Sequence, residues 1–386
     1  MSTLKSFGPL SIESFLSEYW QKKALYTKNA LPGFVSPLSP DEIAGFALDE
    51  DVESRLLVED SGIDELEIEE PGKNRWSYTA GPLSEDDFSK LPETHWTLLI
   101  QHLDSLDPDA NDLLKCFQFL PNWRLDDIMV SFASPGGGVG PHFDYYDVFL
   151  IQGQGKRRWR LGQYCDASSA LVPNQAMKIL EDFELSAEYI CEPGDILYIP
   201  AGVAHWGEAI DDCITYSVGF RAPSFGDALS ELQIQLSESV DPDKRYRDPL
   251  PFKQQKHRGE LRRDAVDVFR NELIKLIDQP DEIIRWLGQN SSSLYPGVEP
   301  AELPLDFVSN NDISEGEPFT LSPYCRALYY PYPDHALLFI NGEQYRCSIE
   351  FAQSLTSGRS ISKSSLGATD QTLARELCDL SLLVQA

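Results

Sequence analysis

Two short segments carry residues whose types and spacing predict metal binding. In GGGVGPHFDYYD, one residue separates His142 from Asp144, so in a β-strand both side chains lie on the same face while Phe143 points to the other. The segment EPGDILYIPAGVAHWG supplies His205 after a turn that contains glycine and proline. We expect this turn to bring the chain back to the same site, where His205 joins the first two residues.

Two imidazoles and one carboxylate leave coordination positions open around a metal ion. This pattern is typical of non-haem Fe(II) that activates O₂ beside a bidentate co-substrate. Structural zinc sites are closed and favour cysteine and histidine, so zinc fits less well. A His-x-Asp pair alone is often an ordinary surface or core pair, and the distal histidine in a β-rich region is what favours a metal. The sequence therefore predicts His142, Asp144 and His205 as iron ligands.

An organic acid bound to the iron needs a cation for its far carboxylate. In KRRWR, Trp159 is expected to point inward, and strand alternation then turns Arg157 inward as well. A buried guanidinium needs a carboxylate partner, and a bidentate arginine–carboxylate pair suits an anchor. Three hydroxyl residues on other predicted strands are further candidates, although ordinary strand positions explain them equally well: Ser131, Thr215 and Ser217.

The remaining histidines have no comparable surroundings in the sequence. His95 and His102 flank an apolar run, His257 lies among basic residues, and His335 lies in a predicted hairpin. We expect each of them to have a structural or surface role.

The metal-binding segments lie within a β-rich region. From residue 96 to 221, short apolar runs alternate with glycine and proline turns, a pattern that indicates an all-β sandwich or barrel. Before this region, helices are predicted at 11–20 and 39–48. In the second helix, Ser39 should be the N-cap of a capping box closed by Glu42.

The chain after Pro223 has a helical pattern. Helices are predicted at 227–240 and 264–287, with Pro280 dividing the second, and PGVEPAELP should be a linker. A stripe of Val266, Phe269, Leu273 and Leu276 predicts a helix that packs against a second copy of the chain, and packing within its own chain is the alternative. The last 80 or so residues should form a small α+β unit. Its features are a hairpin with Asn341-Gly342 in the turn, and helices at 349–355 and 373–383.

The overall charge is strongly acidic. Asp and Glu number 62 against 32 Lys and Arg, which gives a formal net charge of −30. Nucleic-acid binding draws much of its affinity from basic patches, so we expect no direct nucleic-acid binding and a basic partner instead. The plainer interpretation is that acidity keeps the protein soluble. The densest acidic run, 49–70, is either solvated surface or a docking face for such a partner.

Cysteine usage and hydropathy point to an intracellular environment. Seven cysteines are scattered without a Cys-x-x-Cys pair, which is typical of reduced thiols. No segment has the apolar length of a signal peptide or a membrane span. We therefore expect a cytoplasmic protein without membrane contact.

The motifs resemble the JmjC branch of the 2-oxoglutarate oxygenases, and within it the bacterial ribosomal oxygenases, which hydroxylate an arginine of large-subunit ribosomal protein sixteen. The segments DDIMVSFASPGGGVGPHFDYYDVFLIQGQGKRRWR, EPGDILYIPAGVAHWG and TYSVGFRAP carry the resemblance. It implies an α+β protein with a double-stranded β-helix (cupin or JmjC) barrel. It also implies three parts, which are N-terminal elements plus barrel at 1–222 (core 96–222), a helical dimerisation region at 223–295 and a winged-helix-like domain at 305–386.

The same resemblance implies roles for individual residues. His142, Asp144 and His205 match the family's metal ligands, and Arg157 matches its grip on the 2-oxoglutarate carboxylate. Ser131 and Thr215 match positions where relatives offer polar contacts to that co-substrate. The expected cofactors are Fe(II), 2-oxoglutarate and O₂, and the expected protein partners are a basic ribosomal protein and a second copy of the chain.

Two other functions remain open from the sequence. A cupin-type isomerase or small-molecule dioxygenase would share the metal site, but it would not require an inward Arg157 or the long C-terminal additions. A non-catalytic binding module is the third possibility, and the intact metal triad argues against it.

Overall fold

The structure is a computed structural model of the 386-residue chain, and it describes all residues except 1–2, 60–75, 174–176, 249, 252–253 and 295–315. Residues 60–70, the second half of the acidic run at 49–70, and the predicted linker at 296–304 therefore lie outside the described residues. Contacts divide the chain into two compact units, one built mainly from residues up to Ala222 and the other from Pro223 onward. Among the described residues, no helix has both the length and the apolar composition needed to cross a bilayer.

The first unit is built on an eight-stranded sheet in the order β3-β11-β8-β13-β7-β6-β4-β5. All of its paired strands run antiparallel. The strands are β3 (Leu25–Thr27), β4 (Ser54–Glu59), β5 (Trp76–Ala80), β6 (Trp96–Ile100), β7 (Leu125–Ala133), β8 (Asp147–Gln154), β11 (Ile196–Ile199) and β13 (Cys213–Phe220). The sheet therefore includes three strands that precede the barrel core predicted at 96–222.

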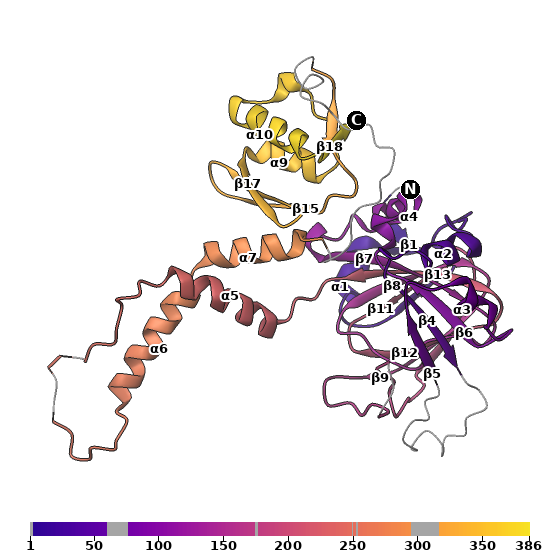
Figure 1. Ribbon diagram of the computed structural model, residues 1–386, viewed down its shortest axis with the longest axis horizontal. Helices are drawn as coiled ribbons and strands as arrows, with labels where there is room; N and C mark the ends of the chain where they lie inside the picture. The colour runs from indigo at the N-terminus through magenta and orange to yellow at the C-terminus, as the bar shows by residue number, and fades with distance from the viewer. Residues whose placement is uncertain (1–2, 60–75, 174–176, 249, 252–253, 295–315) are drawn as a thin grey trace. The chain divides into compact units, whose positions relative to one another are not determined.

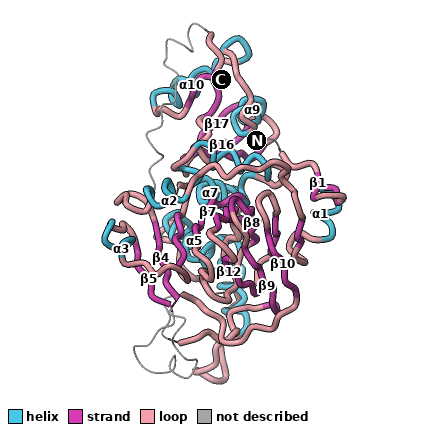
Figure 2. Tube along the Cα trace, turned by 90° about the vertical axis from the view of Figure 1, so that its right-hand side faces the viewer, coloured by secondary structure: helices cyan, strands magenta, loops and turns pink. Residues whose placement is uncertain are grey.

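A second, three-stranded sheet has the order β10-β9-β12 (Figure 2). Its strands are β9 (Arg157–Tyr164), β10 (Ala187–Cys191) and β12 (Val203–Ala209). Single bridges join His142 to His205 and Gly138 to Glu208, so the connection after β7 pairs with β12. Side chains from both sheets line one cavity. This arrangement is the predicted double-stranded β-helix, and the predicted strand segments are confirmed.

An aromatic core packs against the outer side of the larger sheet. Phe149 of β8 lies 4.8 Å from Tyr198, 5.5 Å from Phe220 and 5.7 Å from Phe15, measured between ring centroids. All four side chains are essentially inaccessible to solvent. Phe15 comes from α1 (Ile12–Glu18), so the N-terminal helix covers this face and buries apolar surface that would otherwise contact water.

The N-terminal helices begin where their capping residues predict. In α2 (Pro40–Phe46), the Ser39 side chain accepts from the Glu42 backbone N–H and the Glu42 carboxylate accepts from the Ser39 N–H, so the predicted capping box is confirmed. The other short helices of this unit are α3 (Glu85–Ser89), α4 (Pro108–Asn111), η2 (Leu103–Ser105), η3 (Asp112–Phe117) and η4 (Asn122–Arg124), and a small hairpin joins β1 (Ser6–Phe7) to β2 (Leu10–Ser11).

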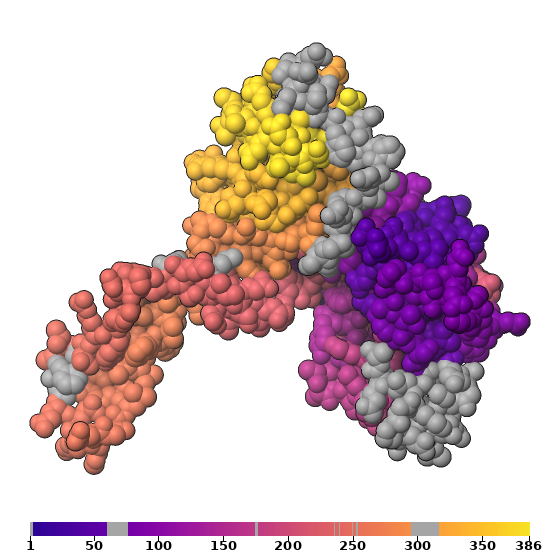
Figure 3. All heavy atoms as spheres, in the orientation of Figure 1, coloured from indigo at the N-terminus to yellow at the C-terminus, as the bar shows by residue number. Residues whose placement is uncertain are grey.

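The second unit begins with three helices, α5 (Phe225–Ser239), α6 (Arg263–Ile277) and α7 (Pro280–Ser292) (Figure 1). Pro280 is the first residue of α7, so it divides the helical stretch as predicted. No residue of α6 is buried, and the atoms of this segment form part of the visible surface (Figure 3). Trp286 of α7 donates from its indole to Glu231 of α5 at 2.7 Å and joins these two helices.

A small α+β fold completes the second unit. It contains β14 (Phe319–Leu321), β15 (Ala327–Pro331), β16 (Ala336–Ile340), β17 (Glu343–Cys347), α9 (Ile349–Thr356), η5 (Lys363–Ser365), α10 (Ala368–Asp379) and β18 (Leu383–Gln385). The turn between β16 and β17 is Asn341-Gly342, both with positive φ, which confirms the hairpin. The helix predicted at 373–383 is wrong at its end, because Leu383 starts β18, which pairs with β14.

Candidate metal centre and co-substrate pocket

The structure brings His142, Asp144 and His205 together. One ligand atom from each lies within 4.8 Å of the others, and they are the one such group among the described residues. The His205 Nε2 is 3.5 Å from an Asp144 carboxylate oxygen, and the two imidazole centroids are 4.2 Å apart. The first two residues lie in the connection between β7 and β8, not in a regular strand as predicted. Two backbone hydrogen bonds between His142 and His205, of 3.0 and 2.8 Å, hold the site together.

Both histidines are oriented with Nε2 free for a metal. The Nδ1 atoms of His142 and His205 lie 3.0 Å from the carbonyl oxygens of Gly140 and Val203, respectively. A carbonyl only accepts, so each Nδ1 carries the hydrogen and each Nε2 presents a lone pair. Burial lowers the pKa of His205 to about 4, an effect that nearby His142 reinforces and Asp144 opposes. His205 is therefore neutral at physiological pH, as a metal ligand must be.

A glycine fixes the backbone beside the carboxylate ligand. The Gly202 N–H donates to the Asp144 carbonyl at 2.7 Å, and Gly202 has a φ of +81°. A Cβ atom at this position would lie 2.5 Å from the Tyr164 ring. Only glycine satisfies both conditions, because a side chain is disfavoured at positive φ and has no room here. His205 lies two residues inside β12, directly after the turn that contains Gly202.

Arg157 is buried without a balancing charge. It is 2% exposed, and no carboxylate forms an ion pair with it in the part of the chain that the structure describes. One guanidinium nitrogen donates to the Ser131 hydroxyl at 3.0 Å, a second lies 3.5 Å from the Gly207 carbonyl, and Nε has no partner. The group also lies 4.9 Å above the Trp159 ring. Burial lowers the pKa of Arg157 because the charged form loses its hydration. Such a cation favours binding of an anion.

The three hydroxyl candidates lie in the same cavity but differ in their hydrogen bonds. Ser131 accepts from Arg157 and donates to the Thr215 carbonyl at 3.3 Å. The Thr215 hydroxyl donates to the Gln152 side chain at 3.1 Å, so its hydrogen is directed away from a ligand. Ser217 lines the cavity two residues farther along β13. Ser131 therefore has the most direct connection to the arginine anchor.

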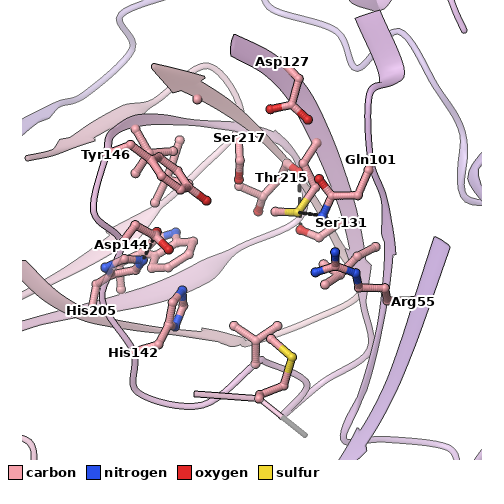
Figure 4. Close-up of a pocket in the computed structure, with 18 of the residues that line it drawn as sticks. Arg55, Gln101, Asp127, Ser131, His142, Asp144, Tyr146, His205, Thr215 and Ser217 are labelled. Atoms are coloured by element: carbon pink, nitrogen blue, oxygen red, sulfur yellow. Dashed lines mark hydrogen bonds and ion pairs between the residues drawn. The ribbon is translucent and has the colours of Figure 1, made fainter. Parts of the chain in front are cut away.

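The cavity has a volume of about 190 Å³ and contains all seven predicted site residues. Figure 4 shows the metal ligands grouped on one side, with Tyr146 above Asp144 and with Asp127 and Arg55 across the pocket. The sequence interpretation missed several polar lining residues: Arg55, Gln101, Asp127 and Tyr146.

Strand alternation could have identified one of the missed residues. Asp127, Met129 and Ser131 are separated by two positions along β7, and all three line the cavity. Arg55 has no such indication, because it comes from β4, far from the metal motifs in sequence. Only the sheet order shows that this strand reaches the pocket.

The donor set and the arginine together fit the expected cofactors. Two neutral imidazoles and one carboxylate are the donors of the facial triad that binds Fe(II) in oxygenases. The buried Arg157 lines the same cavity and is the kind of cation that a dicarboxylate co-substrate requires. All seven cysteines are free thiols, and none belongs to the metal group.

Comparisons with known protein families match three parts of the chain. A JmjC domain matches residues 112–228, an AraC-like ligand binding domain matches 186–277, and a ROXA-like winged helix matches 275–384. The chain is similar to a probable ribosomal oxygenase of Haemophilus influenzae, with 42% identity over 267 residues, which are 68% of this chain and 63% of that protein. It is also similar to the ribosomal protein uL16 3-hydroxylase of Escherichia coli, with 36% identity over 72% of this chain and 71% of that protein.

Solved structures with the same fold cover almost the whole chain. A crystal structure of E. coli ycfD matches with a TM-score of 0.81 and 30% identity over 98% of both chains. A structure of the ribosomal oxygenase YcfD in complex with cobalt and 2-oxoglutarate matches with a TM-score of 0.78 and 30% identity, over 98% of this chain and 97% of that one. The chain therefore belongs to the ribosomal oxygenase family of JmjC-domain proteins.

Proposed function

We propose that this chain is an Fe(II)- and 2-oxoglutarate-dependent hydroxylase of an arginine side chain in a basic ribosomal protein of the large subunit. One observation carries the proposal. A donor set of two histidines and one carboxylate shares a cavity with a buried arginine that has no carboxylate partner among the described residues. The substrate class follows the name of the E. coli relative, a ribosomal protein uL16 3-hydroxylase.

The protein's contribution is to hold and orient the reactants. When bound, Fe(II), 2-oxoglutarate and O₂ would supply the chemistry that inserts one oxygen atom into a C–H bond, with conversion of 2-oxoglutarate to succinate and CO₂. His142, Asp144 and His205 would hold the ion on one face and leave the other face open. Trp159 and Leu150 form apolar walls that limit the access of water.

Arg157 would hold the far carboxylate of the co-substrate. It lies on β9, and its guanidinium already has Ser131 as a partner, so the group is held in position before the ligand arrives. An arginine fork can donate two parallel hydrogen bonds to one carboxylate. Binding of the dicarboxylate would satisfy the free Nε of Arg157 and compensate its charge.

The opposite end of the pocket suits a long cationic side chain. Asp127 supplies a carboxylate with 14% of its side chain exposed, and Ser217 a hydroxyl. Met129 and Tyr146 provide apolar surface between this end and the metal ligands. An arginine side chain combines an apolar stem with a charged head, so it matches both surfaces.

A direct assay tests the proposed function. Protein loaded with Fe(II) and supplied with 2-oxoglutarate is incubated with uL16, other ribosomal proteins, free amino acids and small organic acids. We expect uL16 to gain one oxygen atom, about 16 Da, on one arginine. Hydroxylation of a free small molecule without any protein product would instead favour a cupin-type small-molecule dioxygenase.

Asp127→Asn provides a second test in the same assay. Loss of the carboxylate should raise the KM for the protein substrate, since it removes the charge that receives the arginine head. Asp126→Asn is the matched control, because its carboxylate pairs with Arg221 at 2.9 Å and does not line the cavity. Equal effects of the two variants would contradict the proposed substrate orientation.

The helical region would form a homodimer. In α6, Val266, Phe269 and Leu273 are between 45% and 56% exposed, and Ile274 and Ile277 are also exposed. A row of large apolar side chains on one helix is characteristic of a surface that a partner covers. We propose that the partner is a second copy of the chain.

The winged-helix unit is not expected to bind nucleic acid. Its helix α10 has Asp370, Glu376 and Asp379 against the single Arg375, so it lacks the positive charge that phosphate contacts need.

A further inference from the structure

Four ionisable residues, Arg55, Glu53, His102 and Asp127, form a chain at the substrate end of the pocket. The Arg55 guanidinium lies 2.6 Å from one Glu53 oxygen, and the other Glu53 oxygen lies 3.7 Å from the His102 Nε2. The His102 Nδ1 lies 3.0 Å from an Asp127 carboxylate oxygen. Arg55 and Asp127 both line the cavity, across from the metal ligands (Figure 4). Glu53 and His102 therefore link two pocket residues from behind.

The backbone of His102 adds a second contact to the same carboxylate oxygen. Its N–H donates to Asp127 Oδ2 at 3.3 Å, in addition to the contact from the ring. His102 has φ +53° and ψ +32°, a left-handed conformation that residues with a side chain rarely adopt. Its carbonyl accepts from the Ser105 N–H at 2.9 Å and hydroxyl at 2.6 Å, which stabilises this turn. The turn after β6 thus directs both the backbone and the ring of His102 at Asp127.

The second oxygen of Asp127 is oriented toward the pocket. A Cβ atom added at Gly219 would lie 3.3 Å from Asp127 Oδ1, and Gly219 lines the cavity. Glycine at this position leaves the space in front of Oδ1 open. No lysine or arginine forms an ion pair with Asp127 in the described part of the chain, whereas neighbouring Asp126 pairs with Arg221. One oxygen is held by His102 and the other is available to a ligand.

We propose that His102 is a positioning residue for substrate recognition, oriented by Glu53. The His102 N–H donates to one oxygen of Asp127 and the His102 ring packs 3.0 Å from the same oxygen, so both restrict rotation of the carboxylate and keep Oδ1 facing the site of the substrate's cationic head group. A fixed acceptor binds that group more tightly than a mobile one, because less conformational freedom is lost on binding. The inference rests on the proposed function and names the group that sets its substrate affinity. It differs from the structural or surface role that the sequence predicted for His102.

His102→Gly is the variant of choice. Glycine adopts the left-handed conformation readily and keeps the backbone N–H, so only the ring is removed. We expect the KM for uL16 to rise about 10-fold or more, in the range seen when supporting partners of a site are removed, with the KM for 2-oxoglutarate unchanged. His102→Asn should recover part of the loss, since asparagine tolerates positive φ and has an amide donor.

His95 offers a matched control. It is also a histidine with a left-handed backbone, with φ +66°. His95 directly precedes β6, and His102 lies just after the same strand. It does not line the cavity. His95→Gly should therefore leave the KM for uL16 as it is in the wild type. If both glycine variants raise this KM equally, the effect comes from destabilised turns and the proposal is wrong.

A double-mutant cycle separates positioning from other effects. In an Asp127→Asn background, His102→Gly should have little further effect on the KM for uL16, since its action passes through the carboxylate. Fully additive effects would contradict the proposal. If His102→Gly does not fold, Glu53→Gln takes its place in the cycle.

Two outcomes distinguish a wrong substrate class from a wrong role of His102. Wild-type protein that hydroxylates no ribosomal protein overturns the proposed function, and the role of His102 falls with it. Wild-type protein that is active, with an unchanged KM for uL16 in His102→Gly, overturns only the role of His102.

Discussion

Arg157 is buried, and no carboxylate among the described residues pairs with it. This residue is the feature of the barrel that most clearly favours an anionic ligand. Asp147 shows the contrasting case in the same barrel, because this fully buried carboxylate has Arg124, Tyr198 and Gln21 as partners. Arg157 has a hydroxyl and a carbonyl but no anion among the described residues. A buried charge destabilises the folded state unless it is paired, so binding of an anion to Arg157 would stabilise the folded protein.

Arg157→Met should weaken co-substrate binding strongly. Loss of one partner from a buried charge pair costs about 3–5 kcal/mol, so the KM for 2-oxoglutarate should rise by more than about 100-fold. Succinate should raise the Tm of the wild type and not that of Arg157→Met. Arg158→Met is the control, because its side chain is 31% exposed and pairs with Glu208 on the other face of β9. A defect in Arg158→Met alone would show that the anchor is assigned to the wrong arginine.

His142→Ala should abolish metal-dependent turnover. Removal of one of three ligands should lower Mn(II) affinity by more than about 100-fold, because loss of a residue that only orients a metal ligand already costs about 10–100-fold. Conversion of 2-oxoglutarate should stop. Circular dichroism should show an unchanged fold. His335→Ala, in an exposed turn of the second unit, should bind Mn(II) as the wild type does. Full turnover by His142→Ala would exclude it as a ligand.

Among the elements, α6 has an unusual surface. All of its residues are at least partly exposed, yet its sequence repeats apolar residues every three to four positions. Such a helix gains most of its stability from packing of its apolar face and little from intrinsic propensity. The helix therefore needs a partner surface for its apolar face. The described residues of a single chain do not bury this face.

A charge on the apolar face of α6 should prevent dimer formation. The double variant Phe269→Glu/Leu273→Glu should have the 43.4 kDa monomer mass at micromolar concentration, whereas the wild type should have twice that mass. The reason is that burial of unpaired carboxylates in an interface is unfavourable. Sedimentation equilibrium measures both masses, and Asn271→Glu, outside the stripe, is the control. A wild type that remains a monomer would contradict the proposal.

For the molecule as a whole, charge is unevenly distributed along the chain. Residues 244–263 contain eight of the 32 basic residues and only Asp248 and Glu260 as acids, so this segment carries a charge of +6 and the rest −36. The basic segment belongs to the second unit, whereas the metal centre belongs to the first. The acidic majority of the chain is therefore the part that would attract a basic substrate to the pocket.

Salt should slow the reaction with a basic protein. Raising ionic strength from about 10 mM to about 150 mM shortens the Debye length from roughly 30 Å to roughly 8 Å, which screens long-range attraction. We expect kcat/KM for uL16 to fall over this range, with the KM for the small co-substrate changing much less. A kcat/KM that is independent of salt would show that net charge plays no part in substrate encounter.

The metal ligands and the barrel could be predicted because local rules govern them. Strand segments follow from apolar alternation and turn residues, and His142, Asp144 and His205 lie in motifs with characteristic spacing. Strand alternation also predicted that Arg157 points inward, and this residue is 2% exposed. The next residue, Arg158, then points outward, and its side chain is 31% exposed. These features depend on the periodicity of a strand, which a sequence records directly.

Only the tertiary structure decided which distant residues complete the pocket. Arg55 lines the pocket, and His102 lies behind it against Asp127, although neither residue belongs to a motif. Both come close to Asp127 of β7 because β4 and β6 join the same sheet as β7. The left-handed turn that directs His102 at Asp127 depends on contacts across 25 positions of the chain. Sheet order and register arise from packing of the whole core, so no local pattern encodes them.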